Sequence, residues 1–366
     1  MSRSIIMPII MLGFFSFAIW YTAYRLHAHF KTIRFWKLQI TTIAGIIGSL
    51  IVSAISLKFA NPVAGFVNIL GGYVFLFFLY LVFSLAIVHI IRIVWKPSLI
   101  RSGAAAIAIA FIAVFTGAIF ASFFVVKETE IKIPGLEKKL TVVQISDAHI
   151  GHHRKQNYLS KIVKETNKRN PDMIFITGDL ADAKSTLRMP GALKPLADFK
   201  APVYFVEGNH DMFLNEEHLQ KLAAGHNIRI MRNEVIETHG IQLIGLKYIN
   251  MHGPADYSDA VKLVLSKITL KSDVPSVLIT HSPAGVKYFE AAGIDLLLAG
   301  HLHGGQFFPL FPLANISFPY CRGMYQQGNT KIFMSSGAGT SFLIRARLGS
   351  FNEINLIKLV PDKPDN

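Results

Sequence analysis

The first 126 residues contain four long apolar stretches and no acidic residue. All 23 Asp and Glu residues come later in the chain, whereas nine of the 37 Lys and Arg residues fall within this region. The apolar stretches cover residues 5–24, 38–57, 66–94 and 104–126. Each is close to the roughly 20 residues that a helix needs to cross the hydrocarbon core of a bilayer. The region therefore predicts four membrane-spanning helices.

Two other interpretations of this region fit the sequence less well. A signal peptide at 5–24 would end in a small-residue cleavage site, but Trp20 and Tyr21 lie near its end and further apolar stretches follow. A soluble bundle would need a polar stripe on each helix, which residues 72–91 do not offer. We therefore expect an integral membrane protein of a bacterial inner membrane or plasma membrane.

The distribution of Lys and Arg predicts the orientation of these helices. Basic residues in short loops are retained on the cytoplasmic side. The first loop carries four of them and the third carries Lys96 and Arg101, whereas the second offers only Lys58. Loops one and three are therefore expected inside the cell, which places everything after Val126 outside the cytoplasm. The lysines that directly follow the fourth stretch, and Arg3, favour the opposite orientation.

After residue 126 the pattern changes to that of an α/β domain. Short apolar runs, which predict buried strands, alternate with amphipathic stretches, which predict helices. The expected strands are 140–145, 173–177, 203–206, 277–280, 296–299 and 331–335, and the expected helices are 157–169, 216–224 and 259–267. We divide the chain into a four-helix membrane anchor at 1–126, an α/β domain at 127–360 and a flexible tail at 361–366.

Asp, Asn and His residues follow the first five of these strands, where open α/β sheets usually build their sites. They are Asp147 and His149, then Asp179, then Asn209, His210 and Asp211, then His281, and finally His301 and His303. Residues two apart on an extended chain point the same way, so the first pair and the last pair can each present two ligands. Gly178, Gly208 and Gly300 directly precede candidate ligands and permit sharp turns and close approach.

Each of these residues taken singly is as well explained by a helix cap or a buried hydrogen-bonding group. The single cysteine, Cys321, excludes a cysteine-based metal site, so that nitrogen and oxygen donors remain. Together the residues form the ordered set D-x-H, G-D, G-N-H-D, H and G-H-x-H. This set resembles the calcineurin-like metallophosphoesterases over essentially residues 127–360.

The multi-helix prefix, the run GHLHGGQ and the closing segments SSGAGTS and FNEINLIKL make the whole chain similar to the transmembrane members of that family. The resemblance implies a fold and an activity. The α/β domain would be a four-layer αββα sandwich of the calcineurin-like phosphoesterase type. The chain would be a metal-dependent phosphoric ester hydrolase.

The resemblance also implies a role for each candidate residue. One metal ion would be bound by Asp147, His149, Asp179 and His303, and a second by Asp179, Asn209, His281 and His301. Asp179 would bridge the two ions with its two oxygens. The ions, expected to be Mn, Zn or Fe, would lie about 3.5–4 Å apart and activate a bridging hydroxide that attacks phosphorus in line. His210 would protonate the departing oxygen, oriented and held protonated by Asp211.

Substrate contacts are less constrained by the sequence. The basic residues that could contact phosphate are Arg154, Lys155, Arg322, Arg345 and Arg347, with a solvated surface position as the alternative for each. We select Arg322 and Arg345 as candidate substrate-binding residues. The apolar, proline-rich segment 306–320 predicts either a buried loop or a lip that contacts the bilayer or acyl chains.

We expect hydrolysis of a phosphodiester or pyrophosphate bond, in a lipid-linked or envelope precursor. Three alternatives stay open. Cleavage of UDP-2,3-diacylglucosamine, as in lipid A enzymes of this superfamily, requires a cytoplasmic active site. A protein phosphatase would prefer phosphopeptides, and a non-catalytic membrane sensor would hold structural metals but have no use for His210. The expected partners are the phosphoester substrate and membrane lipids, with no nucleic acid, because most of the excess positive charge lies in the membrane region.

Overall fold

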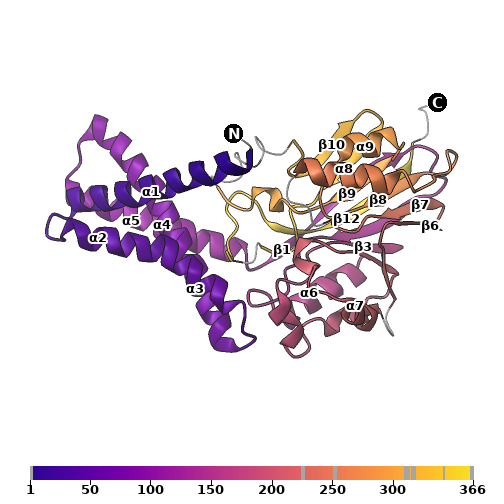
Figure 1. Ribbon diagram of the computed structural model, residues 1–366, viewed down its shortest axis with the longest axis horizontal. Coiled ribbons are helices and arrows are strands. Elements are labelled where there is room, and N and C mark those ends of the chain that lie inside the picture. Colours follow the sequence, from indigo (N-terminus) through magenta and orange to yellow (C-terminus); the bar gives the residue numbers. More distant parts are fainter. Residues whose placement is uncertain are drawn as a thin grey trace. The chain divides into compact units, whose positions relative to one another are not determined.

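The computed structural model describes residues 3–223, 227–249, 254–308, 314, 319–340 and 343–362. By its internal contacts the chain divides into two compact units. The first comprises Met1–Ile119 with Leu343–Ala346, and the second comprises Phe120–Phe342 with Arg347–Asn366. The first unit is helical, whereas the second is built from sheets and helices (Figure 1). The division into anchor, α/β domain and tail at residues 126 and 360 stays a prediction.

Among its described residues, the helical unit contains three segments that are long and apolar enough to cross a membrane. They are Phe35–Ser56, Pro62–Trp95 and Leu99–Phe120. The helices are α1 (Arg3–His29), α2 (Phe35–Ile43), the π-helical η1 (Ala44–Gly48), α3 (Ser49–Ser56), α4 (Pro62–Trp95) and α5 (Leu99–Phe120). The expected span at 5–24 lies within α1, whose side chains are described only from residue 12, so it stays a prediction.

Local signals account for the bounds of α4. The side chain of Asn61 accepts a hydrogen bond from the backbone N–H of Ala64 at 2.8 Å, and Pro62 occupies the first turn, where its missing N–H costs nothing. The helix ends at Trp95 because Lys96 turns into a left-handed conformation with φ 43°. This helix therefore extends beyond the predicted span on both sides.

The bounds predicted for the last span, 104–126, are wrong. Helix α5 ends at Phe120, and the strand β1 (Phe124–Ile133) begins before residue 126. Its first residue, Phe124, pairs in parallel with Asn352 of the last strand. The apolar residues at 124–126 therefore belong to a sheet, a choice that depends on a partner more than 200 residues away in the chain and is invisible to hydropathy alone.

The second unit contains two six-stranded mixed sheets. The first has the order β1-β12-β2-β3-β4-β5 and the second the order β10-β11-β9-β8-β7-β6. The first sheet contains β2 (Leu140–Ile145), β3 (Met173–Thr177), β4 (Val203–Val206), β5 (Ile228–Ile230) and β12 (Asn352–Pro361) beside β1. The second contains β6 (Glu234–Thr238), β7 (Ile241–Gly245), β8 (Ser276–Ile279), β9 (Leu296–Ala299), β10 (Gly323–Gln327) and β11 (Thr330–Met334). All six predicted strands are present.

Parallel pairing sets the position of the strand ends. Strands β2, β3 and β4 are parallel neighbours, and so are β7, β8, β9 and β11. The carboxyl ends of parallel strands meet at one edge of a sheet, so the residues that follow β2, β3 and β4 are brought together, as are those that follow β8 and β9. This pairing carries the candidate ligands to two sheet edges.

The three predicted helices of this unit are confirmed, with ends shifted by a few residues. They are α6 (Gln156–Asn167), α7 (Glu216–Ala223) and α8 (Pro254–Leu265). The structure adds α9 (Val286–Ala291) and four short 3-10 turns, η2 (Lys184–Arg188), η3 (Lys194–Asp198), η4 (Asn209–Asp211) and η5 (His303–Gly305). Sequence analysis also missed β1, β5, β6, β7, β10 and β12.

Three apolar clusters hold the sheets and helices of this unit. One joins the two sheets and includes Phe175 of β3 and Phe333 of β11, both 0% exposed. A second packs α6 on the first sheet through Ile162, and a third packs α9 on the second sheet through Phe289. Each central strand is therefore buried on both faces, which explains why these strands read as uninterrupted apolar runs (Figure 1).

Candidate metal centre

The structure brings all seven predicted metal ligands and His210 into one site. Asp147 and His149 follow β2, and Asp179 follows β3. Asn209 and His210 form the turn η4 after β4. His281 follows β8, and His301 and His303 follow β9. Each residue thus comes from the carboxyl end of a parallel strand, as the order of residues predicted.

The first predicted set of ligands is linked by direct contacts. Nε2 of His149 lies 3.1 Å from Nε2 of His303 and 3.6 Å from Oδ2 of Asp179. Nε2 of His303 lies 3.4 Å from Oδ1 of Asp147. All four side chains therefore converge, and three of them are buried to 2% exposure or less, with His303 at 8%.

The second predicted set is linked in the same way, through His281. Its Nε2 lies 3.1 Å from Oδ1 of Asn209, 3.1 Å from Nδ1 of His301 and 3.3 Å from Oδ2 of Asp179. Oδ2 of Asp179 is thus the atom that the two sets share. Its other oxygen, Oδ1, accepts a hydrogen bond from the backbone N–H of His210 at 2.8 Å. The two oxygens of Asp179 have different partners, whereas the sequence analysis expected both to serve as bridging ligands.

The donor chemistry of this site fits metal ions. Nδ1 of His281 donates to the carbonyl oxygen of Thr177 at 2.9 Å, so in the neutral ring Nε2 presents a lone pair to the oxygens of Asn209 and Asp179. Nδ1 of His149 faces the carboxylate of Asp182 at 3.2 Å, which leaves Nε2 of His149 to face His303 and Asp179. Facing lone pairs repel one another unless a proton or a metal cation lies between them. Three overlapping groups each offer ligand atoms within 4.8 Å of one another, and His210 belongs to one of them. The groups are Asp147, His149 and His303, then His149, Asp179 and His210, and finally Asp147, Asp179 and His281.

When no metal is bound, the repulsion between these lone pairs decides which side chains of the site carry protons. Burial alone would lower the pKa of His281, but the carboxylate of Asp179 outweighs it and raises the pKa to about 10. Burial disfavours the charged form of Asp179 too, yet the neighbouring His281 and His149 lower the pKa of Asp179. Burial and the charge of His281 lower the pKa of His301 to about 3. The site therefore holds a proton on His281, where a cation would replace it.

Five of the candidate ligands have an unusual backbone conformation. The φ angles are 52° at Asp147, 46° at His149, 51° at Asp179, 80° at His301 and 49° at His303. Positive φ is uncommon for residues other than glycine and tends to occur at functional sites, where the surrounding structure compensates its cost. The ligand pairs are therefore presented by left-handed turns. The extended conformation that the sequence analysis assumed for them is wrong.

The glycines before the ligands mainly permit close approach. A side chain at Gly208 would collide with Asp179, and one at Gly300 would collide with Ser146 and Asp147. Only Gly178 also has a positive φ, of 85°, and a Cβ there would meet the ring of His281. The predicted close approach is thus found at all three positions, and the sharp turn at one of them.

Asp182 supports the site and was missed by the sequence analysis. Its carboxylate faces Nδ1 of His149 at 3.2 Å, and its carbonyl oxygen accepts a hydrogen bond from Nδ1 of His210 at 3.0 Å. A second carboxylate three residues after Asp179 was the only signal for it in the sequence. A partner of this kind fixes the orientation of a ligand ring.

Asp211 was expected to orient His210, but its contacts support a different role. Its carboxylate accepts hydrogen bonds from the backbone N–H groups of Gly208 at 2.9 Å, Ala181 at 3.1 Å and Leu180 at 3.3 Å. Burial, and then the charge of Asp179, raise the pKa of Asp211 to about 7. Asp211 thus ties the loop after β4 to the loop after β3, while the carbonyl of Asp182 orients His210.

Arg347 and Arg154 are buried, so the surface alternative considered for them is wrong. Arg347 is 0% exposed and donates to the carbonyl oxygens of His303 at 2.6 Å and Ser336 at 2.6 Å. Arg154 is 2% exposed and donates to the hydroxyl of Thr340 at 2.7 Å. Burial lowers the pKa of Arg347 to about 10, so it still carries a proton at neutral pH. Both arginines hold the loops behind the ligands.

The two candidate substrate contacts belong to different units. The side chain of Arg322 is exposed, passes beside Gly304 and donates to the carbonyl oxygen of Gly349 at 3.1 Å. It is therefore next to the loop that carries His303. Arg345 belongs to the helical unit, and its Nε is buried without a hydrogen-bond partner among the described residues.

Most of the apolar segment 306–320 lies outside the described residues.

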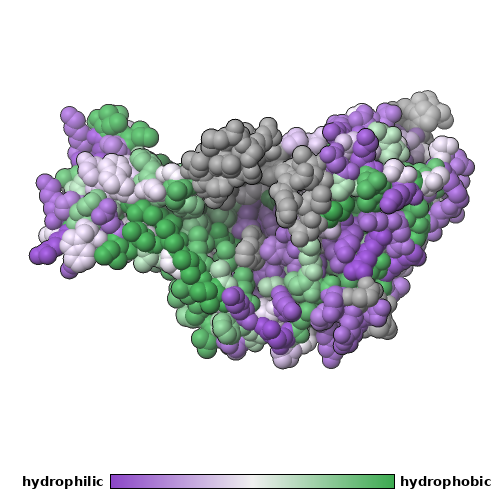
Figure 2. Space-filling model, viewed as in Figure 1, coloured by the Kyte–Doolittle hydropathy of each residue, from purple (hydrophilic) through white to green (hydrophobic). Residues whose placement is uncertain are grey.

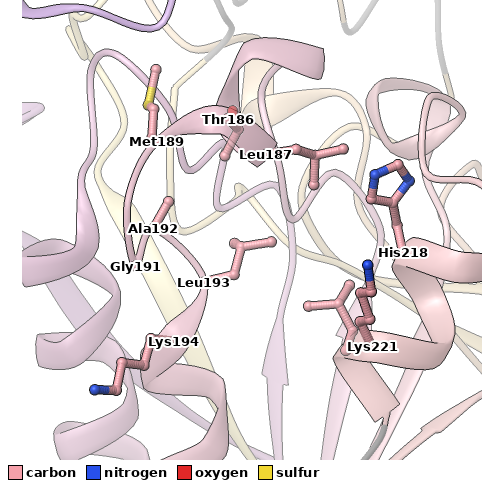
Figure 3. A pocket seen from close by; sticks show the side chains of 10 residues that line it. Thr186, Leu187, Met189, Gly191, Ala192, Leu193, Lys194, His218 and Lys221 are labelled. Atoms are coloured by element: carbon pink, nitrogen blue, oxygen red, sulfur yellow. The ribbon is translucent and has the colours of Figure 1, made fainter.

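A mainly apolar pocket of about 440 Å³ lies beside the segment that follows Asp182. Leu187 and Leu193 lie on one side of it, and His218 and Lys221 of α7 lie across from them (Figure 3). The pocket is completed by Thr186, Met189, Gly191, Ala192, Lys194 and Leu222. None of the candidate metal ligands lines it, so it is a separate feature of the domain.

Comparison with known proteins agrees with the geometry. The calcineurin-like phosphoesterase family matches residues 140–305. An uncharacterised metallophosphoesterase of Campylobacter jejuni is 32% identical over 218 residues, 58% of each chain, and one of Helicobacter pylori is 31% identical over 240 residues, 64% of each chain. A zebrafish (Danio rerio) transmembrane protein with a metallophosphoesterase domain is 31% identical over 245 residues, 62% of this chain and 55% of that protein.

The chain thus spans less than two thirds of the length of each of these relatives. The family match begins at the first residue of β2 and ends at the last residue of η5, so it includes every predicted metal ligand and His210. The chain therefore carries a calcineurin-like metallophosphoesterase domain.

Proposed function

We propose that the protein is a membrane-anchored phosphoesterase that uses two bridged metal ions to hydrolyse a phosphodiester or pyrophosphate bond. The observation that carries this proposal is the shared oxygen of Asp179. Its Oδ2 lies 3.6 Å from His149 and 3.3 Å from His281, which belong to the two different ligand sets. A single carboxylate between two groups of nitrogen and oxygen donors is what a bridged pair of ions requires.

In this proposal one ion is held by Asp147, His149, Asp179 and His303, and the other by Asp179, Asn209, His281 and His301. Imidazole, carboxylate and amide donors suit Mn, Zn or Fe. When bound, the ions would supply Lewis acidity, neutralising charge on the phosphoryl group and lowering the pKa of water. The neutral amide of Asn209 limits the negative charge of the ligand set, which favours approach of an anionic substrate.

His210 is proposed as the acid that protonates the departing oxygen. Its backbone N–H holds Oδ1 of Asp179, and its Nδ1 donates to the carbonyl of Asp182 at 3.0 Å. A ring whose Nδ1 donates to a carbonyl can carry a second proton on Nε2, and that proton would go to the leaving group. His210 is partly exposed, unlike the buried His149 and His281, so a substrate can reach it.

The remaining structural expectations support an enzyme at a membrane surface. We propose that four helices cross the membrane, with α1 as the first, and that the α/β domain is a four-layer αββα sandwich. We further propose that this domain lies outside the cytoplasm, at a bacterial inner membrane or plasma membrane. The three apolar helices support the membrane spans, and the three apolar clusters of the second unit support the layered sandwich. The proposed side of the membrane rests on the Lys and Arg of the short loops.

The substrate that we propose is lipid-linked or an envelope precursor. Membrane anchoring would hold the site near such molecules. Membrane lipids would then be binding partners of the protein as well as the medium that surrounds its helices. UDP-2,3-diacylglucosamine stays the alternative if the domain is cytoplasmic.

Replacing His210 with Ala should lower turnover of a diester substrate at least tenfold, which corresponds to about 1.4 kcal/mol of barrier. Both metals should remain bound, because the proposed ligand sets do not include this ring. Turnover of bis-p-nitrophenyl phosphate and metal content would be measured on the purified protein. His239→Ala, on an exposed turn, is the matched control. Equal turnover in both variants would exclude His210 as the acid and favour a structural role for the metals.

Metal binding should release protons, because His281 carries one at neutral pH and must lose it to donate Nε2. With a pKa of about 10 for His281, binding of Mn²⁺ should still tighten between pH 7 and pH 8.5, by about tenfold per pH unit for each proton released. Ordinary histidines, already neutral there, would give a flat profile. Calorimetric titrations in buffers of different ionisation enthalpy count the protons. No buffer dependence at pH 8 would contradict the proton on His281 in the absence of metal.

The orientation is tested with fusions to the C-terminus in bacterial cells. An alkaline phosphatase fusion should be active and a green fluorescent protein fusion dark, because the chain after α5 is proposed to lie outside the cytoplasm. The same two fusions placed in the loop between α1 and α2 should give the opposite result. A fluorescent C-terminal fusion would reverse the proposed orientation and restore the UDP-2,3-diacylglucosamine alternative.

A further inference from the structure

Polar side chains collect in the helical unit where α1 and α4 end and α5 begins. Tyr21, Arg25 and His29 lie at four-residue spacing near the end of α1, so they share one face of the helix. His89 and Arg92 lie near the end of α4, and Ser102 lies in the first turns of α5. Ionisable groups on membrane helices are costly and usually functional.

Direct contacts join these three helix ends. Nδ1 of His29 donates to the carbonyl oxygen of Leu99 at 2.8 Å, which ties α1 to the start of α5. Arg92 donates to the carbonyl oxygen of Pro97 at 2.6 Å and to the hydroxyl of Ser102 at 3.1 Å. Tyr21 and His89 meet across α1 and α4 at 3.5 Å.

Each arginine lies on the same helix face as a histidine, because Arg25 and His29 are four residues apart on α1 and His89 and Arg92 are three apart on α4. The contact between Tyr21 and His89 brings these two faces together. We call Arg25, His29, His89 and Arg92 the cationic cluster. The two guanidinium groups of Arg25 and Arg92 repel one another unless negative charge is supplied.

The helical unit has no side chain of its own that can supply this charge. Neither the first 119 residues nor the segment 343–346 contains an Asp or Glu. His29 is 2% exposed, yet its Nε2 has no hydrogen-bond partner among the described residues, and neither does the buried Nε of Arg25. Buried polar atoms without partners are rare and usually indicate a missing ligand, ion or water. Because Nδ1 of His29 donates to Leu99, its Nε2 lacks a donor in the neutral ring, whereas Nε of Arg25 is an N–H group that lacks an acceptor. The acceptor that Arg25 lacks is what an anion would supply.

We propose that the cationic cluster binds the phosphate of an anionic glycerophospholipid. Arginine side chains bind phosphate through paired N–H groups, which gives both attraction and geometry. The start of α5 adds the positive end of a helix dipole beside Arg92. The proposal rests on the proposed membrane insertion of these helices, and not on hydrolysis of a phosphoester.

The surroundings of the cluster favour a lipid over a soluble anion. Ile93, Val94 and Trp95 next to Arg92 are 69%, 71% and 76% exposed, so they require an apolar environment. Trp20 and Tyr24 stack with ring centroids 5.3 Å apart beside Arg25, in the manner of the aromatic residues that mark the headgroup level. Figure 2 shows hydrophilic residues gathered at the end of the helical unit that carries the loop between α1 and α2, and apolar surface along the helices.

The experiment compares three additions to the full-length protein purified in a neutral detergent. Phosphatidylglycerol, phosphatidylcholine and sodium phosphate are titrated, and binding is followed by thermophoresis of the labelled protein. Phosphatidylglycerol should bind at least tenfold more tightly than phosphatidylcholine. The double variant Arg25→Gln, Arg92→Gln should lose this preference. Arg101→Gln, an exposed arginine in the same end region, should keep it within twofold.

Melting curves in phosphatidylcholine show whether each variant is folded. If the double variant is not folded, Arg25→Gln alone replaces it, because Nε of Arg25 makes no hydrogen bond to the described residues, and it should weaken the preference at least threefold. Three results would overturn the proposal. The wild type could show no preference for phosphatidylglycerol, sodium phosphate at millimolar concentration could abolish that preference, or Arg101→Gln could weaken binding as much as the cluster variant does. Each result is independent of phosphoesterase turnover.

Discussion

The structure of this domain depends on one buried carboxylate with two groups of histidines around it. Oδ2 of Asp179 lies between His149 and His281, and Oδ1 is fixed by the backbone of His210. Bringing several imidazoles and two carboxylates into a buried space is unfavourable without cations to balance them. The protein therefore has to hold these groups together by contacts that are independent of the metals. The surrounding loops and strands supply these contacts.

Those contacts come from residues that never touch the proposed metal positions. Asp211 binds three backbone N–H groups of the loops after β3 and β4, and Asp182 fixes the rings of His149 and His210. Arg347 binds the backbone of His303 from behind. Left-handed turns at the ligands and glycines beside them let the loops approach closely. A rigid second layer of this kind keeps the ligands in position before any metal arrives.

The central strands and the ligands could be predicted from the sequence because their signals are local. Strands buried on both faces read as apolar runs, and the ligand types follow them in order. Strand β1 could not be predicted, since it pairs with β12 across most of the chain and its residues resemble the end of an apolar helix. Asp182 was missed, and Arg347 was given the wrong role, for a similar reason. Their partners are backbone atoms and rings that only the folded chain brings near them, and an arginine in isolation indicates a surface position.

The central claim is that Asp179 bridges two metal ions. X-ray diffraction from crystals grown with Mn²⁺, recorded near the manganese absorption edge, tests it most directly. The account predicts two anomalous peaks about 3.5–4 Å apart, one on each side of Asp179. One peak would lie among Asp147, His149 and His303, and the other among Asn209, His281 and His301. A single peak, or two peaks of which neither contacts Asp179, would contradict it.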